Sequence, residues 1–332
     1  MTILRILAIG VCIAAFPALA AEPRLAVPID CTVGRDCWVV NHVDLDPSAA
    51  ASDYQCGSAT YDGHKGVDVG LRDVPAMRHG VAVLAAAAGT VAATRDGVAD
   101  RVYSSAFAAE VKDKECGNAV RLDHGDGWQT LYCHLRQGSV VVRPGQVIAS
   151  GQRLGLAGMS GLAQFPHVHF QVMQGGGIVD PFLGRLAAAE RCGARQQPLW
   201  TPAAQAALSY RGVDITNLGF AEKSPDPASV LAGDAANAVP TRAARSIVFW
   251  VEISGARQGD ILRLRLTAPD GTVLADQSTV QGKTAARVYA GIGRDKMSGL
   301  WPAGAYRGDI DVVREGPRPV TRQASGILQL KP

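Results

Sequence analysis

The chain has 332 residues, enough for two domains, with 33 Lys and Arg against 30 Asp and Glu and a formal net charge of +3. No basic cluster interleaved with aromatic residues appears, so nucleic acid is not an expected partner. A net charge this small gives only a weak, salt-sensitive attraction to an acidic wall or membrane surface.

The N-terminus has the pattern of a cleaved secretory signal. Arg5 forms a thin basic region, residues 6–15 are apolar, and Ala18 and Ala20 offer a small-residue cleavage site. The apolar run is shorter than the about 20 residues that a bilayer span needs, and no other segment is a candidate. We therefore expect residues 1–21 to be removed, no integral membrane span, and a periplasmic or secreted protein.

The next segment, residues 22–53, is predicted to be an N-terminal extension with little periodicity. Residues 37–46 permit an edge strand or a lid beside an active site. We favour an irregular extension held by a disulfide between Cys31 and Cys37.

Alternation of residue types predicts strands through the following region. His64, Gly66 and Asp68 fall on one face of a strand-like segment, with valines on the other. From residue 82 to 173, short apolar alternations separated by glycine-containing turns favour antiparallel strands. Helix is scarce, and residues 182–191, after Asp180 and Pro181, are the best candidate.

Histidines gather on three of these segments. His167 and His169 alternate on one face of a predicted strand, and His134 lies within a third strand-like segment. One imidazole and one carboxylate from the earlier segment plus one imidazole from the later segment make three metal ligands. Three ligands leave a fourth position for water, as in a catalytic zinc site. Single histidines are usually ordinary surface or core residues, which is our interpretation of the remaining three: His42, His79 and His124.

Together these segments resemble the lysostaphin/LytM-type zinc endopeptidases of bacterial cell walls, with their His-x-x-x-Asp and later His-x-His motifs. The resemblance covers roughly residues 54–185 and continues through residues 80–91, 118–128 and 142–155. Two residues depart from the family pattern, Phe165 in place of glycine and Gln171 in place of glutamate. Residues 94–117 look like an insertion.

The resemblance implies a role for each site residue. His64, Asp68 and His169 would bind Zn²⁺, and His134 and His167 would be an unliganded pair beside the bound water. Zinc lowers the pKa of its water and polarises the scissile carbonyl. A neutral imidazole can accept the water proton, and a second can stabilise the oxyanion or protonate the leaving amine. No histidine is followed directly by glutamate, so these two histidines are the clustered candidates for the base.

Cysteine count supports an oxidising compartment. Without Cys12 of the signal, six cysteines remain, which suggests three disulfides. Fifteen connectivities are open. Our expected pairs are Cys31–Cys37, Cys56–Cys116 and Cys133–Cys192. Cysteine ligation of a metal would require reduced thiolates, which suit an oxidising compartment poorly.

A second unit follows a predicted linker at residues 186–205. Strand-like runs at residues 246–253, 261–266 and 306–313, separated by Pro- and Gly-containing turns, predict an immunoglobulin-like β-sandwich over residues 206–332. The unit contains no histidine, so we expect a chain that ends near Pro198 to retain cleavage of small peptides. The predicted fold is therefore mainly β, an antiparallel-sheet LytM-type peptidase domain at residues 54–185 followed by this sandwich.

The expected function is that of an exported zinc metalloendopeptidase that hydrolyses peptide bonds in peptidoglycan stems or cross-links. The alternative is a non-catalytic LytM-type protein that binds the wall or activates an amidase. Such proteins typically lack one or more site residues, whereas this chain retains all five. A zinc peptidase of secreted proteins shares the same mechanism, and the bond that is cut stays open.

Overall fold

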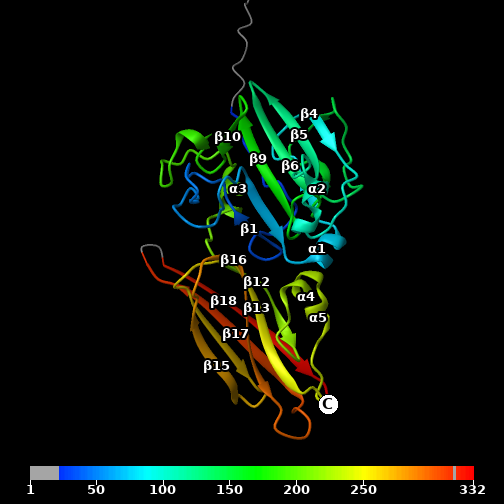
Figure 1. The fold of residues 1–332 in the computed structure, drawn as a ribbon, viewed down its shortest axis with the longest axis vertical. Coiled ribbons are helices and arrows are strands. Elements are labelled where there is room, and N and C mark those ends of the chain that lie inside the picture. The colour runs from blue at the N-terminus through cyan, green and yellow to red at the C-terminus, as the bar shows by residue number, and fades with distance from the viewer. Residues whose placement is uncertain (1–21, 317–318) are drawn as a thin grey trace, which may run out of the picture.

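A computed structural model describes residues 22–316 and 319–332, so the predicted signal sequence lies outside the described residues. The chain is mainly β and its paired strands are antiparallel, as predicted (Figure 1). Two units lie one above the other along the long axis. The core of the first unit is built chiefly from residues 25–208 and that of the second from residues 213–330.

A large antiparallel sheet organises the first unit. Its strands are, in spatial order, β1 (Cys37–Asn41), β2 (Val67–Leu71), β9 (His167–Gln174), β6 (Trp128–Leu135), β5 (Asn118–Gly125), β4 (Gly89–Arg95) and β7 (Val147–Ile148). β10 (Gly177–Asp180) pairs with β9 and with β11 (Arg185–Leu186), while β3 (Ala82–Leu84) pairs with β8 (Arg153–Leu156). The helical segments are short: α1 (Val74–His79), η1 (Ser105–Phe107), α2 (Ala108–Val111), η2 (Ala187–Ala189) and α3 (Pro202–Ala207).

Two local predictions are wrong. The extension that we favoured as irregular contains the edge strand β1, which pairs with β2. The helix expected at residues 182–191 is absent, and that segment holds only β11 and the single turn η2. Gly184 takes φ +71° and donates its N–H to the carbonyl of Asp180, which closes a turn where the helix would have continued.

Three disulfides form among the described residues, with a connectivity that the sequence predicts only in part. Cys31–Cys37 is confirmed. The other two expected pairs are wrong, because the bonds are Cys56–Cys192 and Cys116–Cys133. The β5–β6 hairpin brings the Cα atoms of Cys116 and Cys133 to 4.8 Å, and the chain after Cys192 hydrogen-bonds to the carbonyl of Tyr54, close to Cys56.

Part of the predicted linker packs into the first unit. Trp200 is buried, its ring lies 5.6 Å from that of Phe170, and its backbone forms a bridge with Leu25. A chain that ends near Pro198 would lose this side chain, and loss of a buried tryptophan typically costs about 3–5 kcal/mol. Truncation at that point is therefore expected to destabilise the first unit.

The second unit consists of two facing antiparallel sheets. One contains β12 (Asp214–Ala221), β13 (Ser246–Ala256) and β16 (Ala285–Asp295), and the other contains β15 (Val273–Val280), β14 (Ile261–Thr267), β17 (Gly304–Arg314) and β18 (Val320–Leu330). Helices α4 (Pro227–Ala232) and α5 (Asp234–Asn237) lie beside them. A Cβ at Gly308 would stand 2.2 Å from the ring of Phe249, so glycine lets the two sheets pack closely there. The immunoglobulin type and the domain boundaries stay predictions.

None of the helices in residues 22–316 and 319–332 combines the length and apolar character that crossing a bilayer requires.

Asp180 is buried at the end of β10, where its carboxyl group should make the stability of the fold depend on pH. Its Oδ1 accepts hydrogen bonds from the N–H groups of Phe182 and Leu183, while its Oδ2 has no partner among the described residues. Burial raises the pKa of Asp180 to about 7, against 3.8 for the free group. The folded state therefore holds a proton that the unfolded state releases, so the contribution of Asp180 to stability is fully present below about pH 4 and is lost as the pH rises to about 7.

We expect Asp180→Asn to remove this pH dependence. With these pKa values, the unfolding free energy of the wild type should fall by roughly 3 kcal/mol between pH 4.5 and pH 7.5. Denaturant unfolding at pH 4.5 and pH 7.5 measures the difference for both proteins. Equal losses for the wild type and Asp180→Asn would show that Asp180 does not titrate in this range.

Candidate metal centre

Two neighbouring strands carry the candidate ligands. β2 pairs with β9 in a register that sets Asp68 opposite His169 and Gly70 opposite His167. Directly opposite residues of an antiparallel pair direct their side chains to the same face of the sheet. His64, from the turn that leads into β2, completes the group.

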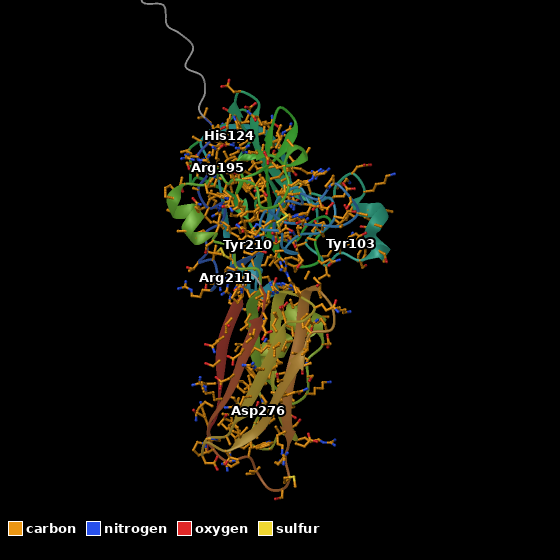
Figure 2. The ribbon with its side chains drawn as sticks, turned by 90° about the vertical axis from the view of Figure 1, so that its left-hand side faces the viewer. Tyr103, His124, Arg195, Tyr210, Arg211 and Asp276 are labelled. Atoms are coloured by element: carbon orange, nitrogen blue, oxygen red, sulfur yellow. A yellow bond between two sulfur atoms is a disulfide. The ribbon has the colours of Figure 1, made fainter. Side chains whose placement is uncertain are left out.

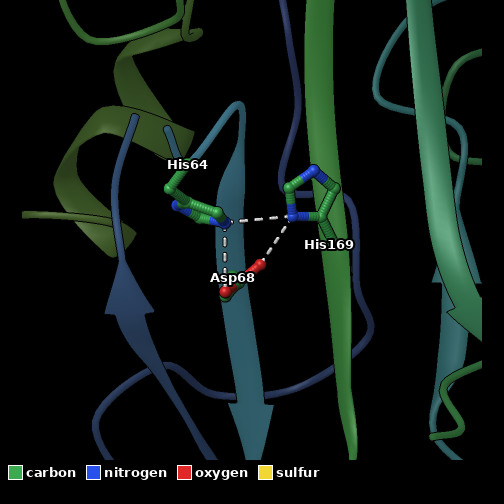
Figure 3. Close-up of side chains that lie close together, drawn as sticks. All are labelled: His64, Asp68 and His169. Carbon is green, nitrogen blue, oxygen red and sulfur yellow. Dashed lines mark hydrogen bonds and ion pairs between the residues drawn. The ribbon is translucent and has the colours of Figure 1, made fainter. Parts of the chain in front are cut away.

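Three donor atoms converge at this point (Figure 3). Nδ1 of His169 lies 2.8 Å from Oδ1 of Asp68 and 3.1 Å from Nε2 of His64, which in turn lies 3.2 Å from Oδ2 of Asp68. Ligands at about 2.0–2.2 Å from a tetrahedral ion stand roughly 3.3 Å apart. The donor set, two imidazoles and one carboxylate, and its spacing fit a zinc-sized ion with one open position.

A glycine keeps this face open. A Cβ on Gly66 would lie 2.7 Å from the ring of His169 and 2.6 Å from the carbonyl oxygen of Phe170. Any side chain at position 66 would therefore push His169 away from Asp68.

The N-terminal extension orients the group, which the sequence analysis missed. The carbonyl of His42 accepts a hydrogen bond from Nδ1 of His64 at 2.7 Å, and this leaves Nε2 of His64 free to bind a metal. Asn41 at the end of β1 donates from Nδ2 to Oδ2 of Asp68 at 2.8 Å. A polar residue at the end of the possible edge strand was the available signal, but its pairing with β2 was needed to place it.

Asn41→Ala should therefore weaken metal binding without abolishing it. Loss of a hydrogen-bonding partner of a ligand typically costs about 10–100-fold in metal affinity or activity. Competition with a chelator measures the affinity, and Asn217→Ala in the second unit is the matched control. Unchanged affinity in Asn41→Ala would contradict an orienting role.

His134 and His167 lie beside the three donors. Their ring centroids are 4.5 Å apart, and Nε2 of His167 is 3.8 Å from Oδ1 of Asp68. Nδ1 of His134 contacts the carbonyl of Ser160 at 2.8 Å, and Nδ1 of His167 contacts that of Phe165 at 2.9 Å. Because a carbonyl only accepts, each Nδ1 carries a hydrogen and each Nε2 keeps its lone pair in the neutral ring.

Both rings are neutral near pH 7. Burial lowers the pKa of His134 well below its usual value, helped by the neighbouring His167 and His169. Burial also lowers the pKa of His167, against the opposing effect of Asp68. Burial acts to raise the pKa of Asp68, but the surrounding histidines outweigh it and keep this carboxylate ionised. One ionised carboxylate beside neutral imidazoles suits a cation site flanked by proton acceptors.

The backbone at His134 is held in an unusual conformation. His134 has φ +60°, and its N–H donates to the carbonyl of Cys116, whose sulfur is bonded to Cys133. A non-glycine residue persists in this region only where the surroundings enforce it. The Cys116–Cys133 disulfide and the Ser160 carbonyl thus fix the direction of the imidazole.

The three remaining histidines lie outside the group. His124 contacts the carbonyl of Ala88 and Thr130 Oγ1, and His79 ends α1. His42 is buried between aromatic rings, its Nδ1 has no partner among the described residues, and burial lowers its pKa to about 4. His42 serves the site through its backbone carbonyl.

Part of the first unit matches a known protein family. Residues 62–181 match the model of Peptidase family M23, and the resemblance to lysostaphin/LytM-type peptidases is confirmed for that part of the chain. The chain is 32% identical over 123 residues to an uncharacterized metalloprotease of Haemophilus influenzae, covering 37% of this chain and 21% of the relative. It is 34% identical over 82 residues to the peptidoglycan DD-endopeptidase ShyA of Vibrio cholerae, covering 24% and 19%.

These curated relatives are matched over only about a fifth of their own length. Among solved structures, the catalytic domain of lysostaphin from Staphylococcus simulans has 21% identity and a TM-score of 0.27, covering 43% of this chain and 86% of that chain. The family match thus describes the site-bearing part of the first unit, and the second unit lies outside it.

Proposed function

We propose that this chain is an exported zinc metalloendopeptidase that hydrolyses peptide bonds in peptidoglycan stems or cross-links. One observation carries the proposal: His64, Asp68 and His169 converge beside two buried, neutral imidazoles whose Nδ1 atoms are both occupied. A site built only to bind wall polymer has no need for two proton acceptors next to a metal-binding group. The relatives named as peptidoglycan DD-endopeptidases support the substrate class.

The roles of the chain's own residues follow from the tautomers. A bound zinc would supply Lewis acidity, lowering the pKa of a water molecule and polarising the scissile carbonyl. Nε2 of His134 or His167 accepts the proton that the attacking water loses as its oxygen bonds to the carbonyl carbon. The imidazolium formed in this way then donates that proton to the amine nitrogen as the C–N bond breaks.

Export is part of the proposal. Three disulfides suit an oxidising compartment such as the periplasm or the exterior. They agree with the signal sequence expected at residues 1–21.

Digestion of purified sacculi by the zinc-loaded protein tests the function. Mass analysis of the released muropeptides should show new peptide termini, and their identity should reveal which bond is cut. Binding of the protein to sacculi without any new terminus, or stimulation of a wall amidase instead, would favour the non-catalytic LytM-type alternative. Cleavage of secreted proteins but not of sacculi would favour a general peptidase.

A further inference from the structure

A hollow beside the metal centre lies between the two units. It has a volume of about 600 Å³, and on the first unit's side it is bordered by Asp68, His134 and His167. The opposite side comes from the second unit and includes Thr284, Ala285 and Ala286, where β16 begins. A unit without any histidine therefore borders the same space as the proposed catalytic groups.

Direct contacts hold the units together around this space. Arg257 donates from Nε to Ser58 Oγ at 2.8 Å and from Nη2 to Tyr210 Oη at 3.4 Å. Tyr210, at the junction of the units in Figure 2, packs against the first unit's core and donates from Oη to Asp53 Oδ2 at 2.9 Å. Leu231 of α4 belongs to the core of the first unit. These contacts hold the two units in fixed positions on either side of the hollow, so the hollow is a defined part of the fold.

A further contact reaches the site itself through Phe165, one of the two residues that depart from the family pattern. The guanidinium of Arg287 on β16 lies 4.3 Å from the centre of the Phe165 ring, which lies 4.7 Å from the ring of His167. Glu252, whose side chain is 1% exposed, fixes Arg287 through an ion pair of 3.1 Å. The second unit thus supports the side chain that packs against His167.

The lining of the hollow indicates what it would hold. Apart from Asp68 and the histidines, its side chains are uncharged, whereas a smaller hollow of about 230 Å³, which is also bordered by His134, includes Lys65 and Glu115. β16 is the edge strand of its sheet, so its outer backbone groups are available to an extended chain. An extended peptide segment without charge matches both properties.

We propose that the space between the units is a substrate subsite that binds an uncharged, extended stretch of the peptide on one side of the scissile bond, with the start of β16 as its outer wall. The inference rests on the proposed function for the identity of the scissile bond. It also replaces the expectation that the second unit is dispensable for cleavage of small peptides.

Ala286→Tyr tests the subsite by filling it. Ala286 is exposed and borders the hollow, so a larger side chain there occupies the space without disturbing a core. Ala305→Tyr, at an exposed position on the distant end of β17, is the matched control. We measure kcat and KM on a purified, soluble cross-linked muropeptide dimer, zinc content, and binding of the same dimer to metal-free protein by calorimetry.

We expect Ala286→Tyr to raise KM and weaken binding about tenfold or more, with zinc content unchanged and Ala305→Tyr equal to the wild type. Wild-type KM and binding in Ala286→Tyr would overturn the subsite. A wild type that binds the dimer without cutting it would refute the proposed function. The subsite would then still stand if Ala286→Tyr lost that binding.

Discussion

Asp68→Ala is expected to leave the purified protein without bound zinc and to lower peptidase activity by about 10³-fold or more. Asp68 contributes the only carboxylate among the three converging donors and contacts both His64 and His169. Without it, two imidazoles remain, and a catalytic zinc site ordinarily needs three protein ligands. A metal ion acting as a Lewis acid stabilises the transition state by several kcal/mol, so its loss accounts for the size of the expected fall in activity.

Metal analysis after dialysis, together with the rate on sacculi, measures both losses, and His64→Ala and His169→Ala should behave alike. Asp276→Ala, at a half-exposed carboxylate on β15 far from the site, is the control that should keep metal and activity (Figure 2). Full zinc occupancy in Asp68→Ala would refute the assignment of the ligands.

His134→Ala and His167→Ala are expected to separate catalysis from metal binding. Neither side chain is one of the three donors, so zinc content should stay near that of the wild type. Activity should fall by about 10²-fold or more, which is typical for removal of a positioned acid–base group. Zinc content and kcat on the same protein samples provide the comparison.

The backbone at His134 calls for a second variant. Alanine is strained at φ +60°, whereas asparagine adopts this region more readily. His134→Asn should therefore keep the fold and still lose activity, and His124→Ala should leave activity unchanged. Near-normal turnover in both His134→Asn and His167→Ala would reduce the two histidines to a structural role.

The candidate ligands could be predicted because their pattern is local. His167 and His169 alternate within one strand. His64 precedes a second strand, and Asp68 lies within it. Both patterns are visible in the sequence without any tertiary structure. The registers of β2 with β9 and of β9 with β6 then bring the segments together. A mainly β fold follows from the same alternation and is confirmed.

The features that the sequence did not predict depend on contacts between segments that are far apart in the chain. Asn41 acts on Asp68 only because β1 joins the sheet edge, and nothing in the local sequence sets that pairing. The hollow beside the site exists only because the start of β16 lies opposite His167 across the junction of the units. The predicted strand-like runs of the second unit do not include β16, and alternation would not show which surface that strand faces.

The Cys56–Cys192 bond affects the order in which the disulfides can form. In a chain that crosses a membrane with its N-terminus first, Cys116 emerges before Cys192, so a non-native partner is available to Cys56 before its native partner. A Cys56–Cys116 bond formed at that stage would have to be undone by thiol–disulfide exchange before the native pairs could form. Its formation would also withhold Cys116 from Cys133, next to His134. Maturation of the protein would then depend on the disulfide isomerase capacity of its compartment, and a cell that lacks this capacity would accumulate full-length chains with a misassembled site.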